Sequence, residues 1–199
     1  MKARRIPLKL LIVAATAALL AWATPAVATD PSRTHVLVAK PQLTDPSYRA
    51  TVLLVRPIGS DQHVGVILNR PTKMTLGQLF PEHPASQKVP DPVFVGGPMN
   101  ASVLFAIVKS KARPGGKLLQ LLPDVYMAFD SDTVDRIIEG GGQARYLAGL
   151  VAWQPGELRS ELRRGAWYIM EADPALVTRK PDGMWEELLR RAEFKANGI

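Results

Sequence analysis

The chain has 199 residues, of which 25 are Lys or Arg, 18 are Asp or Glu, and none is Cys. The absence of Cys excludes a disulfide framework, a thiol nucleophile and a Cys-ligated metal site. A chain of this length can bury a substantial core in one domain without such cross-links.

Residues 1–28 read as a secretory signal peptide. A basic head precedes the uncharged apolar stretch 10–23, and Ala26-Val27-Ala28 has the small-x-small pattern of a signal-peptidase site. The apolar stretch is shorter than the roughly 20 residues that a membrane-spanning helix needs. We therefore predict cleavage after Ala28 and a periplasmic or secreted protein. The alternatives are a leader retained as a membrane anchor and a cytoplasmic location.

The leader also changes the charge argument. It holds four basic residues and no acidic ones, so residues 29–199 have 21 Lys and Arg against 18 Asp and Glu. The net charge then falls from +7 to +3, which gives little electrostatic attraction for a polyanion. The sequence thus argues against nucleic acid as a partner. We predict that residues 29–199 form a single domain.

Predicted strands dominate the first part of this domain. Apolar runs bounded by Pro, Gly and polar residues indicate strands at 36–39, 51–55, 64–68, 93–95, 103–108, 118–122 and 126–129. The second and third of these, joined by a turn at 57–61, read as a hairpin. Thr75 is the predicted N-cap of a short helix that ends before Pro81. The four prolines within 81–92 predict a loop.

Predicted helices come mainly later in the chain. Ser131 or Asp132 should cap a helix that ends at the glycines 140–142. A long apolar strand at 146–153 leads into a second helix, with Pro155 near its first position and Gly165 at its end. A strand at 167–170 precedes an amphipathic helix at 182–194. This order, strands first and helices later, favours an α+β fold with a mainly antiparallel sheet.

Asn69-Arg70-Pro71 follows the strand at 64–68 and is the first candidate binding site. Pro71 favours extended backbone at Arg70, and Asn69 can hydrogen-bond to its own chain or to a neighbouring loop. The three residues can therefore form a structural turn at the end of the strand. They can also present an Arg and an Asn to an anion or a carboxylate.

Gly96-Gly97-Pro98 ends the strand at 93–95. Two glycines permit a positive φ or a close approach of two backbones before Pro98 redirects the chain. The stretch lacks the Lys-Ser/Thr pair of a phosphate loop and the third Gly of a dinucleotide motif. We predict a tight structural turn. The alternative is that the amides of Gly96 and Gly97 face an oxygen ligand.

Glu157 and Glu161 are four residues apart on the second predicted helix, so they share one face. Two carboxylates at this spacing can perform acid–base chemistry or bind a cation. The structural reading is that Glu157 complements the helix dipole and that Glu161 pairs with an Arg such as Arg164. Trp153 and Trp167 are expected to anchor the core.

The sequence contains no strong catalytic or metal-binding signature. His35, His63 and His83 are isolated, without thiols or a His pair four residues apart. No Ser lies in a Gly-x-Ser-x-Gly context. The sequence thus predicts no metal site and no cofactor, and it favours a protein without enzymatic activity.

A set of short motifs occurs in a fixed order along residues 29–199. They are Leu37-Val38-Ala39-Lys40-Pro41, Asp45-Pro46-Ser47-Tyr48, Gly65 through Arg70-Pro71, Gly96-Gly97-Pro98, and Gly149 with Trp153 through Leu162 and Trp167. In these motifs the chain resembles the AlgH/YqgE family. The resemblance implies an α+β fold with a strongly bent, mostly antiparallel sheet of pseudo-barrel character and flanking helices. Members are labelled transcriptional regulators, and no catalytic residues are agreed for the family.

The chain departs from the family pattern in two ways. Ala152 and Glu157 stand where relatives usually carry Gly and Gln, and most relatives resemble cytosolic proteins without a leader. A carboxylate in place of an amide changes the local charge at any ligand site that the family shares.

Three functions are consistent with these features. We expect a non-enzymatic ligand- or protein-binding regulatory protein of the bacterial cell envelope, which acts through a groove near Asn69, Arg70 and 96–98. A second hypothesis is a small hydrolase or isomerase, which requires Glu157 or Glu161 to meet Arg70 in one pocket. A third is a cytosolic transcriptional regulator, as the family label suggests. The expected partner is a protein or a small molecule, and only an uncleaved leader would contact a membrane.

Overall fold

The computed structural model describes residues 33–198, so the predicted signal peptide and its cleavage site lie outside the described residues. The strands are β1 (His35–Ala39), β2 (Val52–Gly59), β3 (Gln62–Ile67), β4 (Pro71–Thr75), β5 (Pro92–Val95), β6 (Met99–Lys109), β7 (Leu118–Leu122), β8 (Val125–Ala128), β9 (Ala144–Trp153) and β10 (Trp167–Glu171). The helices are α1 (Leu76–Leu79), α2 (Ser131–Glu139), α3 (Glu157–Arg163), α4 (Ala175–Thr178) and α5 (Met184–Ala196), with a short 3₁₀ helix at Ser86–Lys88. No helix within residues 33–198 has the length and apolar character needed to cross a bilayer.

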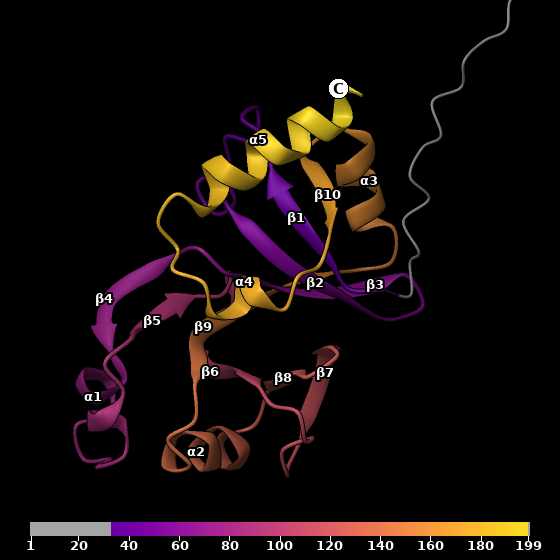
Figure 1. The fold of residues 1–199 in the computed structure, drawn as a ribbon. Helices are drawn as coiled ribbons and strands as arrows, with labels where there is room; N and C mark the ends of the chain where they lie inside the picture. Colours follow the sequence, from indigo (N-terminus) through magenta and orange to yellow (C-terminus); the bar gives the residue numbers. More distant parts are fainter. Residues whose placement is uncertain (1–32, 199) are drawn as a thin grey trace, which may run out of the picture.

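The strands form one continuous sheet of mainly antiparallel pairs. Its order is β10-β1-β2-β3-β9-β6-β8-β7, and each neighbouring pair in that order is antiparallel. β4 pairs with β5, and β5 runs parallel to β9 as a side branch. Helices α3 and α5 lie on the upper part of the sheet in Figure 1, whereas α2 lies at the lower end. The predicted α+β class with a mostly antiparallel sheet is confirmed.

The sheet bends strongly enough to bring its far strands together. The hydroxyl of Thr34, just before β1, donates a hydrogen bond to the carbonyl oxygen of Leu121 in β7. Arg56 in β2 reaches the same hydroxyl, with its Nη1 3.4 Å from the Thr34 oxygen. β1 and β7 are near opposite ends of the sheet order, so these contacts partly close the curl. The pseudo-barrel character that the family resemblance implied is confirmed.

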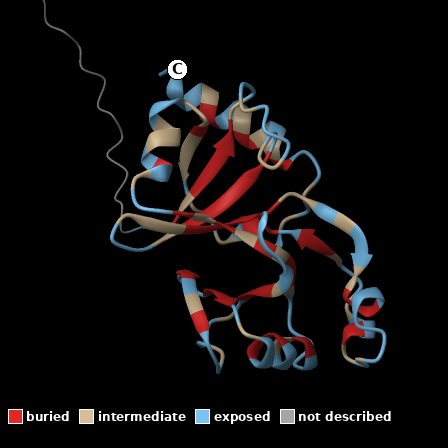
Figure 2. Ribbon diagram, turned by 180° about the vertical axis from the view of Figure 1, so that it is seen from behind, coloured by how far each residue is buried: buried red, intermediate tan, exposed pale blue. Residues whose placement is uncertain are grey.

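Both faces of the central strands are buried. Successive side chains of β1 point to opposite faces. Val36 and Val38 therefore join the core cluster that includes Met184 and Leu188 of α5, whereas Leu37 joins the cluster under α3. Figure 2 shows the strands of this region in red, between partly exposed helices. Burial on both faces explains why β1 is an uninterrupted apolar run instead of an alternating one.

The start of α2 differs from the prediction. Asp130, and not Ser131 or Asp132, is the N-cap, because its carboxylate Oδ1 accepts a hydrogen bond from the Thr133 amide at 3.3 Å. The pKa of Asp130 is lowered, first by the hydrogen bond from the Thr133 side chain. The prediction was therefore wrong by one or two residues, since three consecutive residues of the sequence have side chains that can cap a helix.

The two later helices also begin after their predicted starts. α3 begins at Glu157, because Gly156 before it has a φ of +85°. Pro155 consequently belongs to the preceding turn and not to the first helical turn. α5 begins at Met184 after Gly183, whose φ is +66°, and not at Asp182. In both places a glycine with left-handed backbone directly precedes the helix. The sequence pattern did not specify this glycine conformation.

Three short elements were not predicted, one of which is the 3₁₀ helix at Ser86–Lys88 within the predicted loop 81–92. Pro71 to Thr75 forms the strand β4, which pairs with β5 at Pro71 opposite Phe94. A proline is compatible with this position because β5 is the one strand of residues 33–198 that pairs with β4. The helix α4 has four residues, too few to show a helical period in the sequence.

Candidate functional site

Asn69 holds the end of the loop between β1 and β2. Its side-chain oxygen accepts a hydrogen bond from the Val52 amide at 2.9 Å, and its side-chain nitrogen donates to the Ala50 carbonyl at 2.9 Å. Ala50 has a φ of +54°, an unfavourable conformation for a residue with a Cβ. The Asn69 amide thus stabilises a strained turn, which agrees with the structural role of the two roles considered for this motif.

Arg70 holds the same loop from its other side. Its Nη1 donates to the Ser47 carbonyl at 2.7 Å, and its Nη2 donates to the Arg49 carbonyl at 2.9 Å. Burial lowers the pKa of Arg70, and the nearby positive charge of Arg49 lowers it further. Two N–H donors of the guanidinium, which the sequence analysis considered for an anionic ligand, are therefore hydrogen-bonded to backbone oxygens.

Gly96 and Gly97 lie where two backbones approach closely. A Cβ on Gly96 would be 2.2 Å from the carbonyl oxygen of Gly149 in β9, and one on Gly97 would be 2.2 Å from Leu150 backbone atoms. The Gly96 amide donates to the Ala148 carbonyl at 2.8 Å. The glycines thus serve close packing against β9, and the Gly96 amide is already hydrogen-bonded within the sheet.

Glu157 and Glu161 both accept hydrogen bonds from nitrogen donors of the protein. Glu157 accepts from the Gln154 amide at 2.8 Å and closes the turn before α3. Glu161 accepts from two indole nitrogens through the same oxygen, Oε2, at 3.1 Å from Trp153 and at 2.8 Å from Trp167. The two tryptophans are buried, as predicted for core anchors.

The predicted pairing of Glu161 with Arg164 is wrong. The Nη1 of Arg164 instead donates to the Ser160 hydroxyl at 3.1 Å. Tyr48 packs edge-on against Trp167 with ring centroids 6.0 Å apart. Burial raises the pKa of Tyr48, and the negative charge of Glu161 raises it further. The two indole N–H groups explain why Glu161 faces the sheet instead of an arginine.

Arg70 and Glu161 make different contacts around the loop 45–50. Arg70 donates to the carbonyls of this loop, while Glu161 serves the tryptophans against which Tyr48 packs. Neither Glu157 nor Glu161 lines the pocket described below, and Arg70 does not line it either. Arg70, Glu157 and Glu161 therefore do not meet in this pocket.

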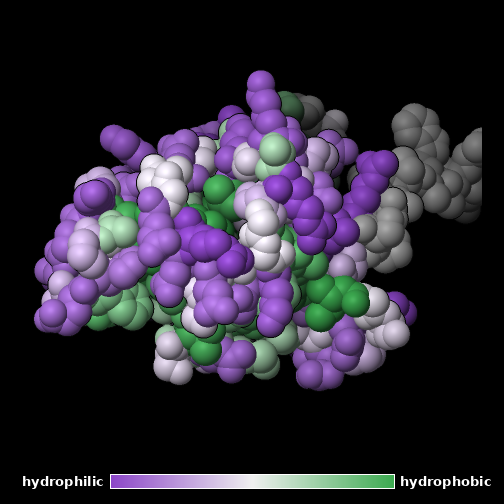
Figure 3. Space-filling model, turned by 90° about the horizontal axis from the view of Figure 1, so that it is seen from below, coloured by the Kyte–Doolittle hydropathy of each residue, from purple (hydrophilic) through white to green (hydrophobic). Residues whose placement is uncertain are grey.

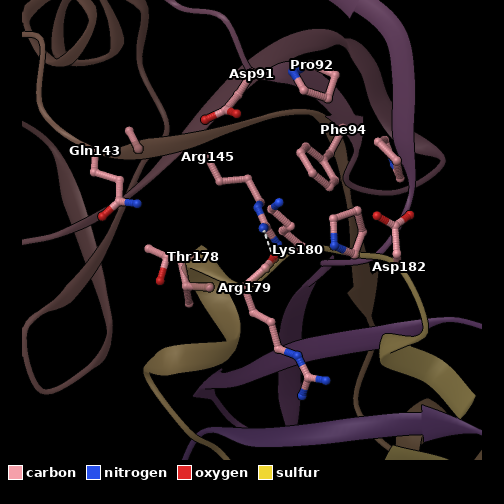
Figure 4. Close-up of a pocket in the computed structure, with 13 residues that line it drawn as sticks. Asp91, Pro92, Phe94, Gln143, Arg145, Thr178, Arg179, Lys180 and Asp182 are labelled. Carbon is pink, nitrogen blue, oxygen red and sulfur yellow. Dashed lines mark hydrogen bonds between the residues drawn. The ribbon is translucent and has the colours of Figure 1, made fainter. Parts of the chain in front are cut away.

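A pocket of about 310 Å³ lies next to the Asn69–Pro71 turn. Its walls come from Pro71 in β4, from the start of β5, from residues 143–145 at the start of β9, and from the segment 177–182 that joins α4 to α5. Four segments of the chain that are separate in sequence therefore enclose it (Figure 4). Pro71 is the one predicted site residue in its lining.

Arg145 is the buried charged residue of this pocket, with 9% of its surface exposed. Its Nη1 donates to the Leu68 carbonyl at 2.8 Å, and its Nη2 donates to the Arg179 carbonyl. The guanidinium carbon lies 4.4 Å from the centroid of the Phe94 ring, a cation–π contact. Arg145 thus connects the ends of β3 and α4 and presents its head to the pocket.

Within residues 33–198, the positive charge of Arg145 has no close counter-ion. No carboxylate of residues 33–198 lies within 4.0 Å of its guanidinium, although the more distant Asp91 stabilises the charge. Burial lowers the pKa of Arg145 to about 10, so the side chain is still a cation at neutral pH. The Arg179 side chain points away from the pocket (Figure 4) and pairs with Glu187.

Sequence reasoning missed Arg145 because it started the strand at 146. An Arg that directly precedes the apolar run 146–153 is an available signal, since β9 is a central strand and its first residues are buried. A charged residue in such a strand indicates a specific role, because burial of an unpaired charge is unfavourable in free energy. His, Cys, Asp and Glu residues in the described part of the chain form no group of three that could hold a metal.

Apolar side chains also reach the surface outside this pocket. Those with more than a third of their surface exposed include Met74, Leu79, Phe80, Val95, Met99 and Val103. Seen from below, green apolar side chains occur in separate patches among purple polar ones (Figure 3). In this view the surface is mixed, and no continuous apolar face covers the molecule.

Comparison with known proteins identifies the family. A family model described as AlgH-like matches residues 36–197. A UPF0301 protein of Streptomyces coelicolor is 32% identical over 166 residues, which cover 79% of this chain and 84% of the relative. One of Thermobifida fusca is 33% identical over 167 residues, with 78% and 84% covered. The chain therefore belongs to the AlgH-like family, and the identification from its motifs is confirmed.

Solved structures agree with this assignment. The chain is similar to the solution structure of the AlgH protein from Pseudomonas aeruginosa, with a TM-score of 0.65 and 27% identity over 83% of this chain and 88% of that one. A crystal structure of a Corynebacterium diphtheriae protein gives a TM-score of 0.66 at 23% identity, covering 81% and 87% of the two chains. The second match shows the fold alone. None of these names states an activity, so the site itself has to support a function.

Proposed function

We propose that this chain is a non-enzymatic binding protein of the bacterial cell envelope, and that its ligand occupies the Arg145 pocket. The observation that carries the proposal is Arg145 itself, a buried cation that has no close counter-ion among the described residues and that lies on the wall of a pocket of about 310 Å³. Pockets that hold small molecules are commonly concave, largely apolar and furnished with few polar groups. Phe94 and three prolines supply the apolar part of this lining.

The proposed ligand site lies beside the groove predicted near Asn69, Arg70 and 96–98, and not in it. Pro71 lines the pocket directly, and Arg145 donates to the carbonyl of Leu68, just before the Asn69–Pro71 turn. Asn69 and Arg70 shape the neighbouring loop through backbone contacts. In this proposal the turn positions one wall of the pocket, while Arg145 meets the ligand.

Binding fits the pocket better than catalysis does. Its lining contains no His, Cys or Ser, so it offers no Ser–His or Cys–His pair. The charged side chains at its mouth, Asp91, Lys180 and Asp182, are exposed. An acid–base catalyst is usually held in a defined position beside its reacting atom. The proposal therefore predicts that the ligand leaves the protein chemically unchanged.

The test is to identify what the pocket retains. Protein purified from cells that express the complete chain would be equilibrated with a bacterial small-molecule extract, washed and denatured, and the released compounds identified by mass spectrometry. The wild type and the control Arg159→Gln should release the same compound, whereas Arg145→Gln should not. Arg159 is a surface residue paired with Asp61 at 3.0 Å. Retention of no compound, or retention independent of Arg145, would contradict the proposal.

The envelope location rests on the sequence of residues 1–28. Intact mass and cell fractionation of the native protein test it. A chain that starts at Thr29 in a periplasmic extract or the culture medium is the expected result. A full-length cytosolic product would overturn the envelope assignment and would favour the regulatory role that the family label suggests.

A further inference from the structure

The guanidinium of Arg145 keeps hydrogen-bonding capacity for a ligand. It carries five N–H donors, and the described residues provide acceptors for two of them, the carbonyls of Leu68 and Arg179. Phe94 covers one face of the guanidinium plane, so a ligand would approach in the plane. A carboxylate fits this geometry, because its two oxygens can accept two parallel N–H bonds.

The charge of the same group favours an anionic ligand. Carbonyl oxygens orient Arg145 but carry no net charge, and the nearest carboxylate that affects it, Asp91, lies beyond ion-pair distance. A buried charge without a counter-ion is unfavourable. An anionic group at Arg145 would supply the missing charge. The buried position would also protect the resulting ion pair from screening by salt.

The mouth of the pocket limits how much negative charge the ligand can carry. Asp91 and Asp182 both line the pocket, and so does Lys180. Figure 4 places the two carboxylates on different sides of Arg145. A dianion such as phosphate would face these two like charges, which the single ammonium group of Lys180 offsets only in part. A ligand with one carboxylate and one ammonium group would instead find a partner of opposite charge at each end. The pocket volume of about 310 Å³ selects a compact molecule.

We infer that the pocket binds a compact amino carboxylate, with the carboxylate on Arg145 and the ammonium group toward Asp91 or Asp182. The inference rests on the proposed binding function and names its ligand class. It assigns Arg145 as the anchoring residue and the two aspartates as residues that determine specificity.

The direct test is a titration of the full chain with matched probes. Glycine, β-alanine and 4-aminobutyrate vary the spacing of the two charges, butyrate keeps only the anion, butylammonium keeps only the cation, and inorganic phosphate adds negative charge. The best amino carboxylate should bind about fivefold more tightly than butyrate, which is typical of one additional partly exposed ion pair. Phosphate should bind more weakly than butyrate. Tightest binding of phosphate, or equal binding of butyrate and the amino carboxylates, would overturn the inference.

Variants locate the two ends of the ligand. Arg145→Lys keeps the charge but loses the planar fork, so both butyrate and the amino carboxylate should bind at least tenfold more weakly. The double variant Asp91→Asn/Asp182→Asn should lose the preference for the amino carboxylate and keep butyrate binding. Arg159→Gln is the control and should match the wild type. The wild-type titration decides the outcome even where an Arg145 variant fails to fold.

The two proposals can fail separately. A neutral or polyanionic compound retained from the extract through Arg145 would leave the binding function standing and would refute the amino carboxylate. Retention of no compound, together with no binding of any probe, would refute both. A wild type that binds no probe, with destabilised Arg145 variants, would mean that Arg145 serves only to connect β3, β9 and α4.

Discussion

Glu161 accepts a hydrogen bond from the indole nitrogen of Trp167 at 2.8 Å. The same carboxylate oxygen accepts a second bond from Trp153 at 3.1 Å. Because the three residues belong to α3, β10 and β9, one oxygen fastens a surface helix to two strands. The two indole rings are buried, so their N–H groups would otherwise lack a partner.

Replacement of Glu161 should therefore destabilise the fold. Glu161→Ala leaves two indole N–H groups without an acceptor, and we expect a loss of about 2–3 kcal/mol in the free energy of unfolding. Glu161→Gln keeps a neutral acceptor and should cost about 1 kcal/mol. Urea unfolding followed by tryptophan fluorescence measures both values. Arg164→Ala, which removes a contact on the exposed side of the same helix, is the control; an equal loss there would contradict the role of Glu161.

Asn69 should contribute to stability through two backbone contacts. Asn69→Ala removes the acceptor for Val52 and the donor for Ala50, and we expect a loss of about 2 kcal/mol. Asn69→Asp keeps the acceptor and should lose less. Thermal unfolding of the three proteins measures the order. Wild-type stability in Asn69→Ala would show that the strained turn at Ala50 forms without this side chain.

Gly149 and Gly141 provide a matched pair for the close approach of β9 to the 96–98 turn. Both have positive φ, +76° and +62°. A Cβ on Gly149 would lie 2.2 Å from the Gly97 carbonyl oxygen, whereas one on Gly141 would meet no atom within 4 Å. Gly141→Ala should cost about 1 kcal/mol from backbone strain, and Gly149→Ala about 4 kcal/mol or more. Soluble yield and melting temperature measure the difference; similar values would contradict the packing role.

Stability should fall at alkaline pH through Tyr146. Burial raises its pKa to about 12, above the ordinary value of 10.0, so the folded state holds the phenolic proton more tightly than the unfolded chain. This stabilisation is complete below pH 10 and is lost as the pH rises through 12. Between pH 9 and 11 the wild type should lose about 1 kcal/mol more than Tyr146→Phe. Arg145 titrates in both proteins, so the difference isolates Tyr146. Parallel pH profiles of the two proteins would contradict the assignment.

The sequence predicts the fold of this chain better than its site. The apolar runs of β1 and β9 and the family motifs lead to the correct class, because burial on both sheet faces leaves a strong apolar signal. Pro71 was read as part of a turn, since only tertiary pairing with Phe94 makes it a strand residue. The sequence predicted an arginine as the partner of Glu161. Its actual indole partners are eight and six residues away, and they contact it only because the sheet brings them together.

Arg145 shows the same limit more clearly. Its partners Leu68 and Arg179 are 77 and 34 residues away, and the pocket exists only after four segments of the chain come together. Short motifs report local backbone requirements such as those of Asn69 and Gly96. They do not report a cavity that depends on long-range contacts.

An NMR titration of the isotope-labelled protein with the amino carboxylate that binds best of the three tests whether Arg145 anchors the ligand. The Arg145 side-chain signal, assigned by its absence in Arg145→Lys, should shift in a saturable manner together with the amides of residues 177–182. The amides of residues 45–50 and 157–161 should stay in place. Saturable shifts at the glutamates of α3 with none at Arg145 would show that the ligand does not bind at Arg145, and the absence of any shift would show that it does not bind at all.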